Sequence, residues 1–252
     1  MSEEHVLRAS GLRLSIGGAS ILDGIDLEVS AGELIGVIGP NGAGKTTLFN
    51  VLSGIVTPTA GRVWLHGHDV TSRSVVQRAR AGLGRSFQTS NLFPELTALE
   101  NVRIAAQAAL GGSLSLLTRP RSADAATAAA RQRLAEVGLA DRAGSPVAAL
   151  AHGEQRKVEI AMLLALDTKV ILLDEPMAGV ATGDVAGLVE LIRLVHREQG
   201  RTVLMVEHHI DVVLGLADRV AVLHHGRLLA CASPAEVMAD PLVQKAYLGR
   251  AA

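Results

Sequence analysis

A glycine-rich segment at residues 39–46 has the residue types and the spacing that phosphate binding requires. It reads GPNGAGKT and fits the pattern G-x-x-x-x-G-K-[ST]. Gly42 and Gly44 permit backbone conformations that turn successive N–H groups toward one phosphate. Lys45 supplies a positive charge for the β- and γ-phosphates, and Thr46 supplies a hydroxyl for Mg²⁺. We expect the nucleoside triphosphate to contact Gly39, Pro40, Asn41, Gly42, Ala43, Gly44, Lys45, Thr46 and Thr47.

The segments on either side of this loop supply the context that the motif needs. Residues 34–38 form a short apolar run, which is typical of a strand buried on both faces. Residues 45–53 have helical character, so the positive end of a helix would point at the same phosphate. An incidental glycine-rich turn would need neither neighbour. The order strand, loop, helix therefore favours a phosphate-binding loop.

A second chemical signal lies at residues 170–176, which read VILLDEP. Four apolar residues predict a buried strand, and Asp174 and Glu175 follow directly at its carboxyl end, the edge where ligands bind in open α/β folds. Asp174 could hold Mg²⁺ through water, and Glu175 could polarise a water molecule for attack on the γ-phosphate. The alternative is a solvated acidic turn. The phosphate loop in the same chain favours the catalytic interpretation.

Composition excludes several other classes of protein. The 252 residues carry a formal net charge of −1, so no global field attracts nucleic acid or an anionic membrane. The single cysteine, Cys231, cannot form an internal disulfide, which fits a reducing compartment. The first ten residues are unlike a secretory signal, and the longest nearly apolar stretch, 104–117, is too short and polar to span a bilayer. We expect a soluble, cytosolic chain.

Hydrophobic periodicity predicts strands alternating with helices on both sides of a helical region. Before it, we expect strands at 12–16, 25–29, 61–66 and 84–87 and a helix at 75–81. From 89 to 150 the pattern is helical and alanine-rich, with helices at 97–110 and 123–137 and a polar loop at 111–122. Thr97 and Glu100 would form a capping box. After it, helices at 153–166, 184–199, 210–217, 234–239 and 241–248 alternate with strands at 202–206, 219–223 and 227–230. This alternation predicts a parallel sheet covered on both faces.

The motifs together resemble the ATP-binding-cassette (ABC) ATPases over essentially the whole chain. Besides the two segments above, Gln88 lies in SFQ, residues 150–154 read LAHGE, and His208 lies in VEH. The resemblance implies an α/β P-loop NTPase (RecA-like) core with an antiparallel β subdomain and an inserted α-helical subdomain. The core would comprise residues 1–88 and 156–252. The helical subdomain would comprise 89–155, with LAHGE at its end.

The same resemblance implies the remaining site residues. Each ATP would lie between the phosphate loop of one chain and the LAHGE segment of a second, in a head-to-tail dimer. Gln88 would sense Mg²⁺ and the attacking water, and His208 would contact the γ-phosphate beside Glu175. The other implied contacts with ATP are Ile16, at the place of the usual adenine-stacking aromatic, and Ala151, His152, Gly153 and Glu154.

A narrower resemblance is to the LivG-type subfamily, the ATPases of branched-chain amino acid importers. SFQ around Gln88, the extended segment 103–133, EIAMLLA after LAHGE, VEHHIDVVLGLADRVAVL and the ending DPLVQKAYLG match that subfamily. It implies transmembrane permease subunits, a second ATPase subunit of the same or another kind, and indirectly a periplasmic or lipid-anchored solute-binding protein. The chain would then lie on the inner face of the cell membrane. Nucleic acid is not an expected partner.

Three residues depart from the general ABC pattern. Ala151 replaces the serine of the signature LSGGQ, which removes a hydroxyl from the partner's γ-phosphate. Ala181 stands where the family generally carries Asp or Asn, which puts a contact across the dimer in doubt. Ile16 covers a ring face without aromatic stacking, so adenine selectivity is expected to be loose. Unequal ATP sites, formed with a different ATPase subunit, would accommodate the two alanines.

Other functions remain open at this point. Urea, amides or other small solutes could be the cargo, and an ATPase of lipopolysaccharide export shares a similar ending. A soluble ABC protein would usually carry two cassettes or a long coiled coil, and this chain has one cassette and no heptad run. A small P-loop kinase would need neither LAHGE nor the pair Glu175 and His208.

Overall fold

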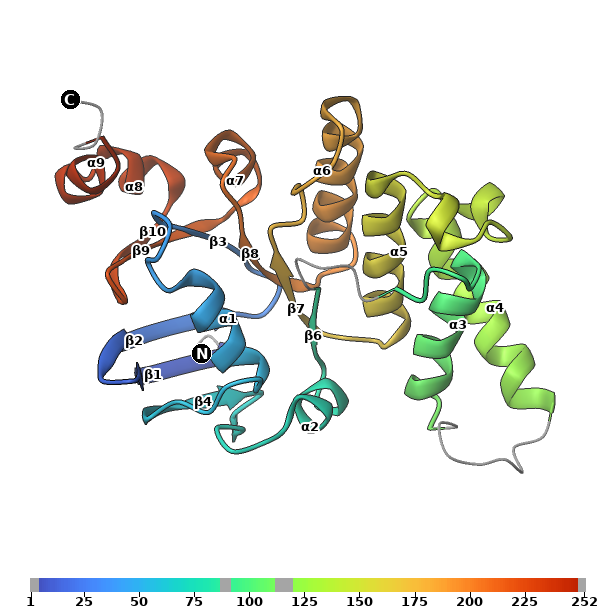
Figure 1. Ribbon diagram of the computed structural model, residues 1–252, viewed down its shortest axis with the longest axis horizontal. Coiled ribbons are helices and arrows are strands. Elements are labelled where there is room, and N and C mark those ends of the chain that lie inside the picture. Colours follow the sequence, from blue (N-terminus) through green and yellow to red (C-terminus); the bar gives the residue numbers. More distant parts are fainter. Residues whose placement is uncertain (1–4, 87–91, 112–119, 249–252) are drawn as a thin grey trace.

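The computed structural model describes residues 5–86, 92–111 and 120–248, which form two β-sheets and a set of covering helices (Figure 1). The larger sheet has the strand order β10-β9-β3-β8-β7-β6, and the smaller has the order β2-β1-β4-β5. The strands are β1 (His5–Ile16), β2 (Ala19–Ser30), β3 (Leu34–Ile38), β4 (Ala60–Leu65), β5 (His68–Asp69), β6 (Leu83–Arg85), β7 (Val170–Asp174), β8 (Thr202–Val206), β9 (Arg219–His224) and β10 (Arg227–Ala232).

The central strands of the larger sheet are buried on both faces. In β3, Leu34 and Ile38 belong to one hydrophobic cluster, whereas Ile35 and Val37 belong to a second cluster on the opposite face. β7 and β8 divide their side chains between the same two clusters. These strands pair in parallel with their neighbours, and only β10 runs antiparallel, to β9. Burial on both faces explains why their sequences are continuously apolar.

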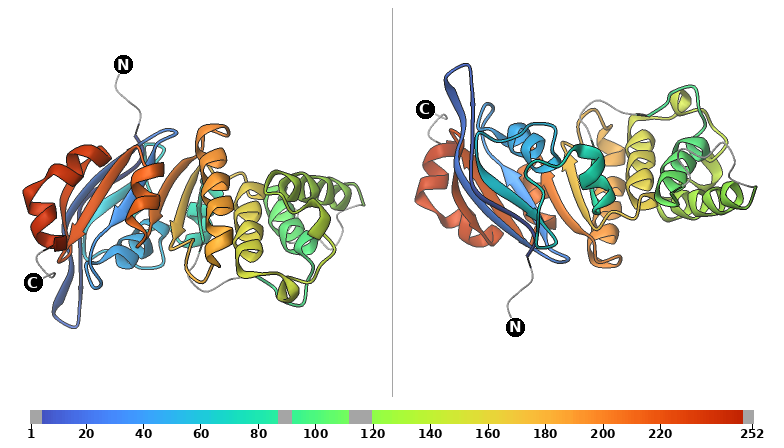
Figure 2. Two further views of the ribbon diagram at one scale, coloured as in Figure 1. Left: turned by 90° about the horizontal axis from the view of Figure 1, so that it is seen from above. Right: turned by 90° about the horizontal axis from the view of Figure 1, so that it is seen from below.

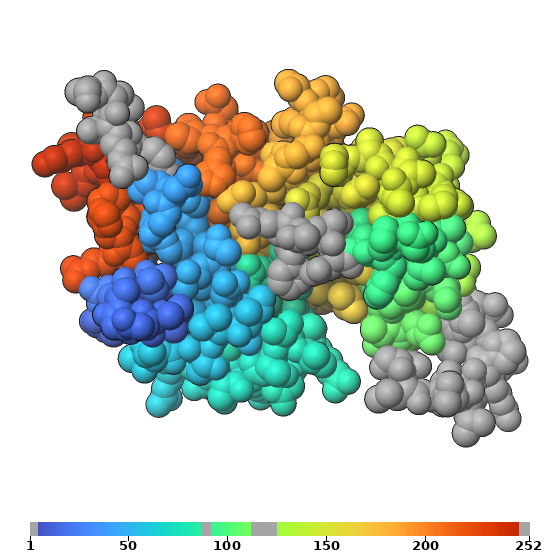
Figure 3. All heavy atoms as spheres, in the orientation of Figure 1, coloured from blue at the N-terminus to red at the C-terminus, as the bar shows by residue number. Residues whose placement is uncertain are grey.

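Helices cover both faces of this sheet and extend it at one end. They are α1 (Lys45–Ser53), α2 (Val75–Arg80), α3 (Ala98–Ala109), α4 (Pro120–Glu136), α5 (His152–Ala165), α6 (Thr182–Arg197), α7 (Ile210–Leu216), α8 (Pro234–Ala239) and α9 (Pro241–Leu248). α1 packs with the antiparallel sheet on one face, and α6 and α7 contribute to the cluster on the other. Helices α3 and α4 lie at one end of the molecule and strands β1 and β2 toward the other, as Figures 2 and 3 also show.

Most of the expected elements are present with small changes of boundary. The predicted helix over 97–110 is α3, and the Thr97–Glu100 capping box at its start is confirmed. β1 and β2 begin earlier than predicted, because the missed parts carry exposed polar residues, such as Arg8 in β1 and Ser20 in β2, that hide the strand pattern. The prediction of a polar loop over 111–122 was wrong for its last three residues, because α4 begins at Pro120. Proline is well suited to the first turn of a helix. The division at residues 89 and 155 stays a prediction.

Candidate active site

The strand order brings three functional segments to one edge of the larger sheet. β8 lies between β3 and β7, and all three run parallel. Their carboxyl ends therefore meet, which places the phosphate loop, the acidic pair and the His208 turn side by side. A cavity of about 300 Å³ opens there. It is lined by Ile21, Asn41, Gly42, Ala43, Gly44, Lys45, Thr46, Thr47, Glu175 and His208.

The loop between β3 and α1 has the backbone conformation that its glycines predict. Gly42 and Gly44 have φ values of 80° and 102°, in the left-handed region that other residues avoid. Gly39 is restricted by space, because a Cβ atom there would lie 2.3 Å from the Leu223 carbonyl oxygen. α1 begins directly at Lys45, so its free N–H groups face the loop. The combination is a cradle for an anion.

Lys45 holds the cradle in shape. Its side chain is only 6% exposed, and Nζ donates hydrogen bonds to the carbonyl oxygens of Gly39 (2.7 Å) and Pro40 (3.2 Å). Burial lowers the pKa of Lys45, and the nearby carboxylates of Glu175 and Asp174 oppose that shift. These two carbonyl oxygens carry only partial negative charge. A phosphate that enters the cavity would therefore be a stronger partner for the Lys45 ammonium group.

Glu175 and His208 are in direct contact, as their predicted joint role requires. His208 Nε2 lies 2.8 Å from Glu175 Oε1, and both side chains line the cavity. The Glu175 N–H donates to the Val206 carbonyl oxygen at 2.9 Å, which ties the turn after β7 to the end of β8. Glu175 has φ of 50°, an uncommon value for a residue with a side chain. This backbone turn aims the carboxylate at the cavity, where it could accept a proton from water.

The residues around Asp174 fit a bound Mg²⁺. Asp174 is 1% exposed, and its Oδ2 accepts a hydrogen bond from Arg85 Nη2 at 2.7 Å. Its Oδ1 is buried without a hydrogen-bond partner among the residues that the structure describes. An unsatisfied carboxylate oxygen and the Thr46 hydroxyl are the hard oxygen donors that Mg²⁺ prefers, alone or through water.

Arg85 is a site residue that the sequence reasoning missed. Besides pairing with Asp174, Arg85 Nη1 donates to Asn50 Oδ1 (2.7 Å) and Ser53 Oγ (3.0 Å) on α1. Its guanidinium carbon lies 5.8 Å from the centre of the Phe49 ring. The available signal was an arginine inside the strand predicted at 84–87, and it did not indicate which residue Arg85 would contact. Arg85 thus connects β6, the helix of the phosphate loop and the acidic pair.

Several expected contacts do not reach this cavity. Ala151 and His152 are exposed at the start of α5, on the other side of β7 from α1 (Figure 1). Ile16 is 60% exposed at the end of β1, while Ile21, which was not predicted, lines the cavity. Gly153 and Glu154 also lie in α5, outside the lining. Gln88 falls outside the described residues.

The start of α5 is capped from one side only. Glu154 Oε2 accepts a hydrogen bond from the Ala151 N–H at 3.0 Å, and Arg142 Nε binds Glu154 Oε1 at 3.0 Å. Because an alanine side chain has no acceptor, the reciprocal half of a capping box is missing. The N–H groups of this first helix turn have no partner within the helix, so they could bind an anion.

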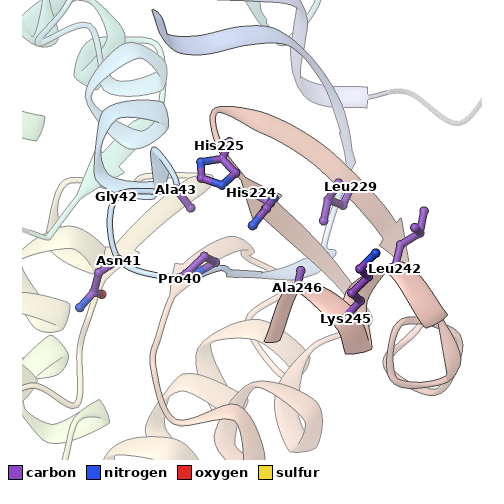
Figure 4. A pocket seen from close by; sticks show the side chains of 10 residues that line it. All are labelled: Pro40, Asn41, Gly42, Ala43, His224, His225, Leu229, Leu242, Lys245 and Ala246. Atoms are coloured by element: carbon purple, nitrogen blue, oxygen red, sulfur yellow. The ribbon is translucent and has the colours of Figure 1, made fainter. Parts of the chain in front are cut away.

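A larger cavity of about 430 Å³ lies on the other side of the phosphate loop (Figure 4). His224, the last residue of β9, and His225, in the turn that follows, line it together with Lys245 of α9. No carboxylate belongs to its lining, and the described residues contain no group of three His, Cys, Asp or Glu that could hold a metal ion. The histidine pair therefore lacks a metal-ligand set.

Family models of known proteins match two parts of the chain. A family model described as "ABC transporter" matches residues 22–178, which include the phosphate loop and the acidic pair. The chain belongs to the ABC transporter family. A second model, "Branched-chain amino acid ATP-binding cassette transporter", matches residues 227–252 of this ABC ATPase.

Two curated relatives of this ABC ATPase match almost end to end. The "High-affinity branched-chain amino acid transport ATP-binding protein BraF" of Pseudomonas aeruginosa is 37% identical over 251 residues, covering 98% of each chain. The corresponding protein LivG of Escherichia coli K12 is 36% identical over 253 residues, covering 98% of this chain and 99% of LivG. The resemblance to the LivG type is thus confirmed.

A solved structure shares the fold of this ABC ATPase. The ADP conformation of MJ1267, an ATP-binding cassette of an ABC transporter, aligns with a TM-score of 0.84 and 29% identity, covering 97% of this chain and 99% of MJ1267. The predicted P-loop NTPase architecture is therefore confirmed. As a member of this family the chain binds nucleotide and is an ABC-type ATPase.

Proposed function

We propose that this ABC ATPase powers an importer of branched-chain or other hydrophobic amino acids. The observation that carries the proposal is the match of residues 227–252 to the model of branched-chain amino acid cassettes, beside the end-to-end similarity to BraF and LivG. The described part of this tail, residues 227–248, contributes no residue to the lining of the nucleotide cavity, so its likeness reflects kinship with one type of transporter and not the common chemistry of ATP hydrolysis.

In the proposed reaction Glu175 is the general base. Its carboxylate accepts a proton from the water that attacks the γ-phosphate, and His208, at 2.8 Å, orients it and contacts the same phosphate. Thr46, Asp174 and Gln88 would hold Mg²⁺, which supplies positive charge to the phosphate oxygens when bound. Lys45 binds the β- and γ-phosphates, and the loop N–H groups surround them.

The position of α5 supports pairing with a second ATPase subunit. Ala151, His152, Gly153 and Glu154 do not line the cavity of their own chain, and their helix start is open on one side. We therefore assign them to the ATP of a second subunit, in a head-to-tail dimer that ATP closes and hydrolysis reopens. The partner is either a second copy or a different ATPase.

Transport of a solute across a membrane needs a component that spans the membrane. Among the residues that the structure describes, no helix is long and apolar enough to cross a bilayer. We propose that transmembrane permease subunits hold the chain at the inner face of the cell membrane, where the helical subdomain 89–155 and the Gln88 segment transmit motion. A periplasmic or lipid-anchored solute-binding protein would deliver the solute to the permease.

The test compares the wild-type chain with Glu175→Gln, each assembled with its permease in proteoliposomes. Wild type should hydrolyse ATP faster when leucine-loaded binding protein is added outside, and should accumulate leucine. Glu175→Gln should lose hydrolysis by about 10²- to 10⁴-fold, the usual contribution of a general base, while still binding ATP. Glu198→Gln, an exposed residue at the end of α6, is the control and should behave as wild type.

The possible results separate the two parts of the proposal. Hydrolysis by Glu175→Gln at more than a tenth of the wild-type rate would remove Glu175 from the role of base. Stimulated hydrolysis without leucine uptake would keep the motor and refute the solute, and a screen of urea, amides and other amino acids would follow.

A further inference from the structure

Glu207 is a buried carboxylate beside the active site that is not itself among the residues lining the nucleotide cavity. It follows β8 directly and is 3% exposed. The residues lining the cavity include its neighbour His208 but not Glu207 itself. Burying a carboxylate is unfavourable unless hydrogen bonds compensate, so its contacts indicate why this position holds a charge.

The two oxygens of Glu207 bind two different turns. Oε1 accepts a hydrogen bond from the Met177 N–H at 2.8 Å, in the turn after β7. Oε2 accepts one from the His208 N–H at 2.9 Å and lies 3.1 Å from His209 Nδ1, in the turn after β8. Met177 is two residues beyond Glu175. One side chain therefore connects the backbone that carries Glu175 to the backbone that carries His208.

This connection fixes a geometry that the local backbone alone would hold poorly. Glu175 has φ of 50°, a conformation that persists only where surrounding contacts determine it. The bond from its N–H to Val206 fixes the start of the turn, and Glu207 fixes the turn again two residues later. His208 then meets Glu175 at 2.8 Å.

We propose that Glu207 is a positioning residue that holds Glu175 and His208 in register and so sets the rate of ATP hydrolysis without touching ATP. The proposal rests on the proposed roles of Glu175 and His208. It predicts that removing the charge of Glu207 lowers kcat, while the affinity for ATP and the folded state are largely retained, because the phosphate cradle is built from other residues.

The first variant is Glu207→Gln in the full-length chain. The amide keeps the size of the side chain, but its NH₂ group must face an N–H donor at one of the two turns. Loss of a hydrogen bond to a charged group should lower kcat by about 10- to 100-fold. The dissociation constant for a non-hydrolysable ATP analogue should change by less than about twofold, since no cradle contact is removed. Glu198→Gln again serves as the exposed control.

A double-mutant cycle with His208→Ala separates positioning from a general structural effect. If Glu207 acts through the Glu175–His208 pair, the double variant should lose clearly less than the product of the two single losses, because part of the effect of Glu207 passes through His208. Multiplication of the two losses would overturn the proposal. So would an unchanged kcat in Glu207→Gln, or a loss of ATP affinity as large as the loss of kcat.

Glu207→Asp keeps the test decisive if Glu207→Gln fails to fold. Glu207→Asp retains the charge and both oxygens. Its kcat should lie between that of Glu207→Gln and that of the wild type. If Glu207→Gln does not fold, the kcat of Glu207→Asp should still lie partly below the wild-type value. A wild-type kcat in Glu207→Asp would contradict the proposal that hydrolysis needs the hydrogen bonds of Glu207 to both turns. Failure of the proposed function would be recognised separately. If Glu175→Gln hydrolyses ATP, Glu175 is not the general base, whatever the result for Glu207.

Discussion

At the scale of single residues, the site combines side chains that line the nucleotide cavity with charged side chains that hold them in place. Asp174 and Arg85 form an ion pair at 2.7 Å in which the two side chains are 1% and 5% exposed. Water cannot solvate either charge, so each depends on the other. Among the residues that the structure describes, Asp174 Oδ1 has no hydrogen-bond partner, so this oxygen could bind a metal ion or its water.

This dependence gives a stability prediction for Arg85→Met. The variant leaves the Asp174 charge buried without its cation, which should lower the free energy of unfolding by about 3–5 kcal/mol. Equilibrium unfolding in urea, without nucleotide, measures the change. The matched control is Arg62→Met, whose ion pair with Asp69 is 3.7 Å long and largely exposed. The control should change stability by less than about 1 kcal/mol, and a similarly small change in Arg85→Met would show that the buried pair contributes little.

At the scale of elements, the phosphate loop depends on how α1 is held at its other end. Arg78 on α2 is 1% exposed, and Nη1 donates to the carbonyl oxygens of Val51 and Leu52 at 2.7 Å each. These belong to the last turn of α1, where carbonyl groups lack partners within the helix. Burial lowers the pKa of Arg78 to about 10, which still leaves it charged at neutral pH. A short helix thus anchors the C-terminal end of the helix that begins at Lys45.

Arg78→Met should weaken both the fold and nucleotide binding. Arg78→Met removes the donors of the Leu52 and Thr71 carbonyl groups, at about 1–3 kcal/mol for each group left unsatisfied, so the free energy of unfolding should fall by at least about 2 kcal/mol. A loosened α1 should also raise the dissociation constant for ATP, measured with a fluorescent analogue. Arg80→Met lies on the same helix at an exposed position and should leave both quantities unchanged. Unaltered ATP binding in a destabilised Arg78→Met would confine Arg78 to a role in folding.

At the scale of the whole molecule, the open question is which subunit faces the phosphate loop. The start of α5 carries Ala151, and α6 begins after Ala181, so neither position offers the side-chain oxygen expected across a dimer. Losing one hydrogen bond to a charged group corresponds to about 10- to 150-fold in rate if it acts only in the transition state. Pairing with a different ATPase that supplies both groups at one of the two sites would restore that site.

We therefore expect the isolated chain to dimerise weakly and to hydrolyse ATP slowly. Light scattering coupled to size exclusion, with Glu175→Gln and ATP to block turnover, measures the dimer. In that background Ala151→Ser should strengthen the dimer, and in the chain with Glu175 intact it should raise the rate of ATP hydrolysis. Ala148→Ser, also exposed but three residues earlier, should change neither quantity. Fast, cooperative hydrolysis by the unmodified chain alone would argue for a homodimer.

Local sequence determined the parts of the site that lie close together along the chain. Residues 34–53 contain the strand, the glycines and the helix that build the cradle, and residues 170–175 contain a buried strand with its terminal carboxylates. Each of these patterns specifies its own backbone, because strand burial, left-handed glycines and a helix start are properties of a few neighbouring residues. The alternation of strands and helices likewise predicted the larger sheet.

Tertiary structure alone decided which distant residues meet. Arg85 lies 89 residues from Asp174, and Glu207 lies 30 residues from Met177, so nothing in either local pattern names the partner. The strand order, with β8 between β3 and β7, places His208 against Glu175. It also places Glu207 where it accepts hydrogen bonds from both turns. Burial then makes these pairs strong and necessary, because a charge removed from water must find its partner inside the protein.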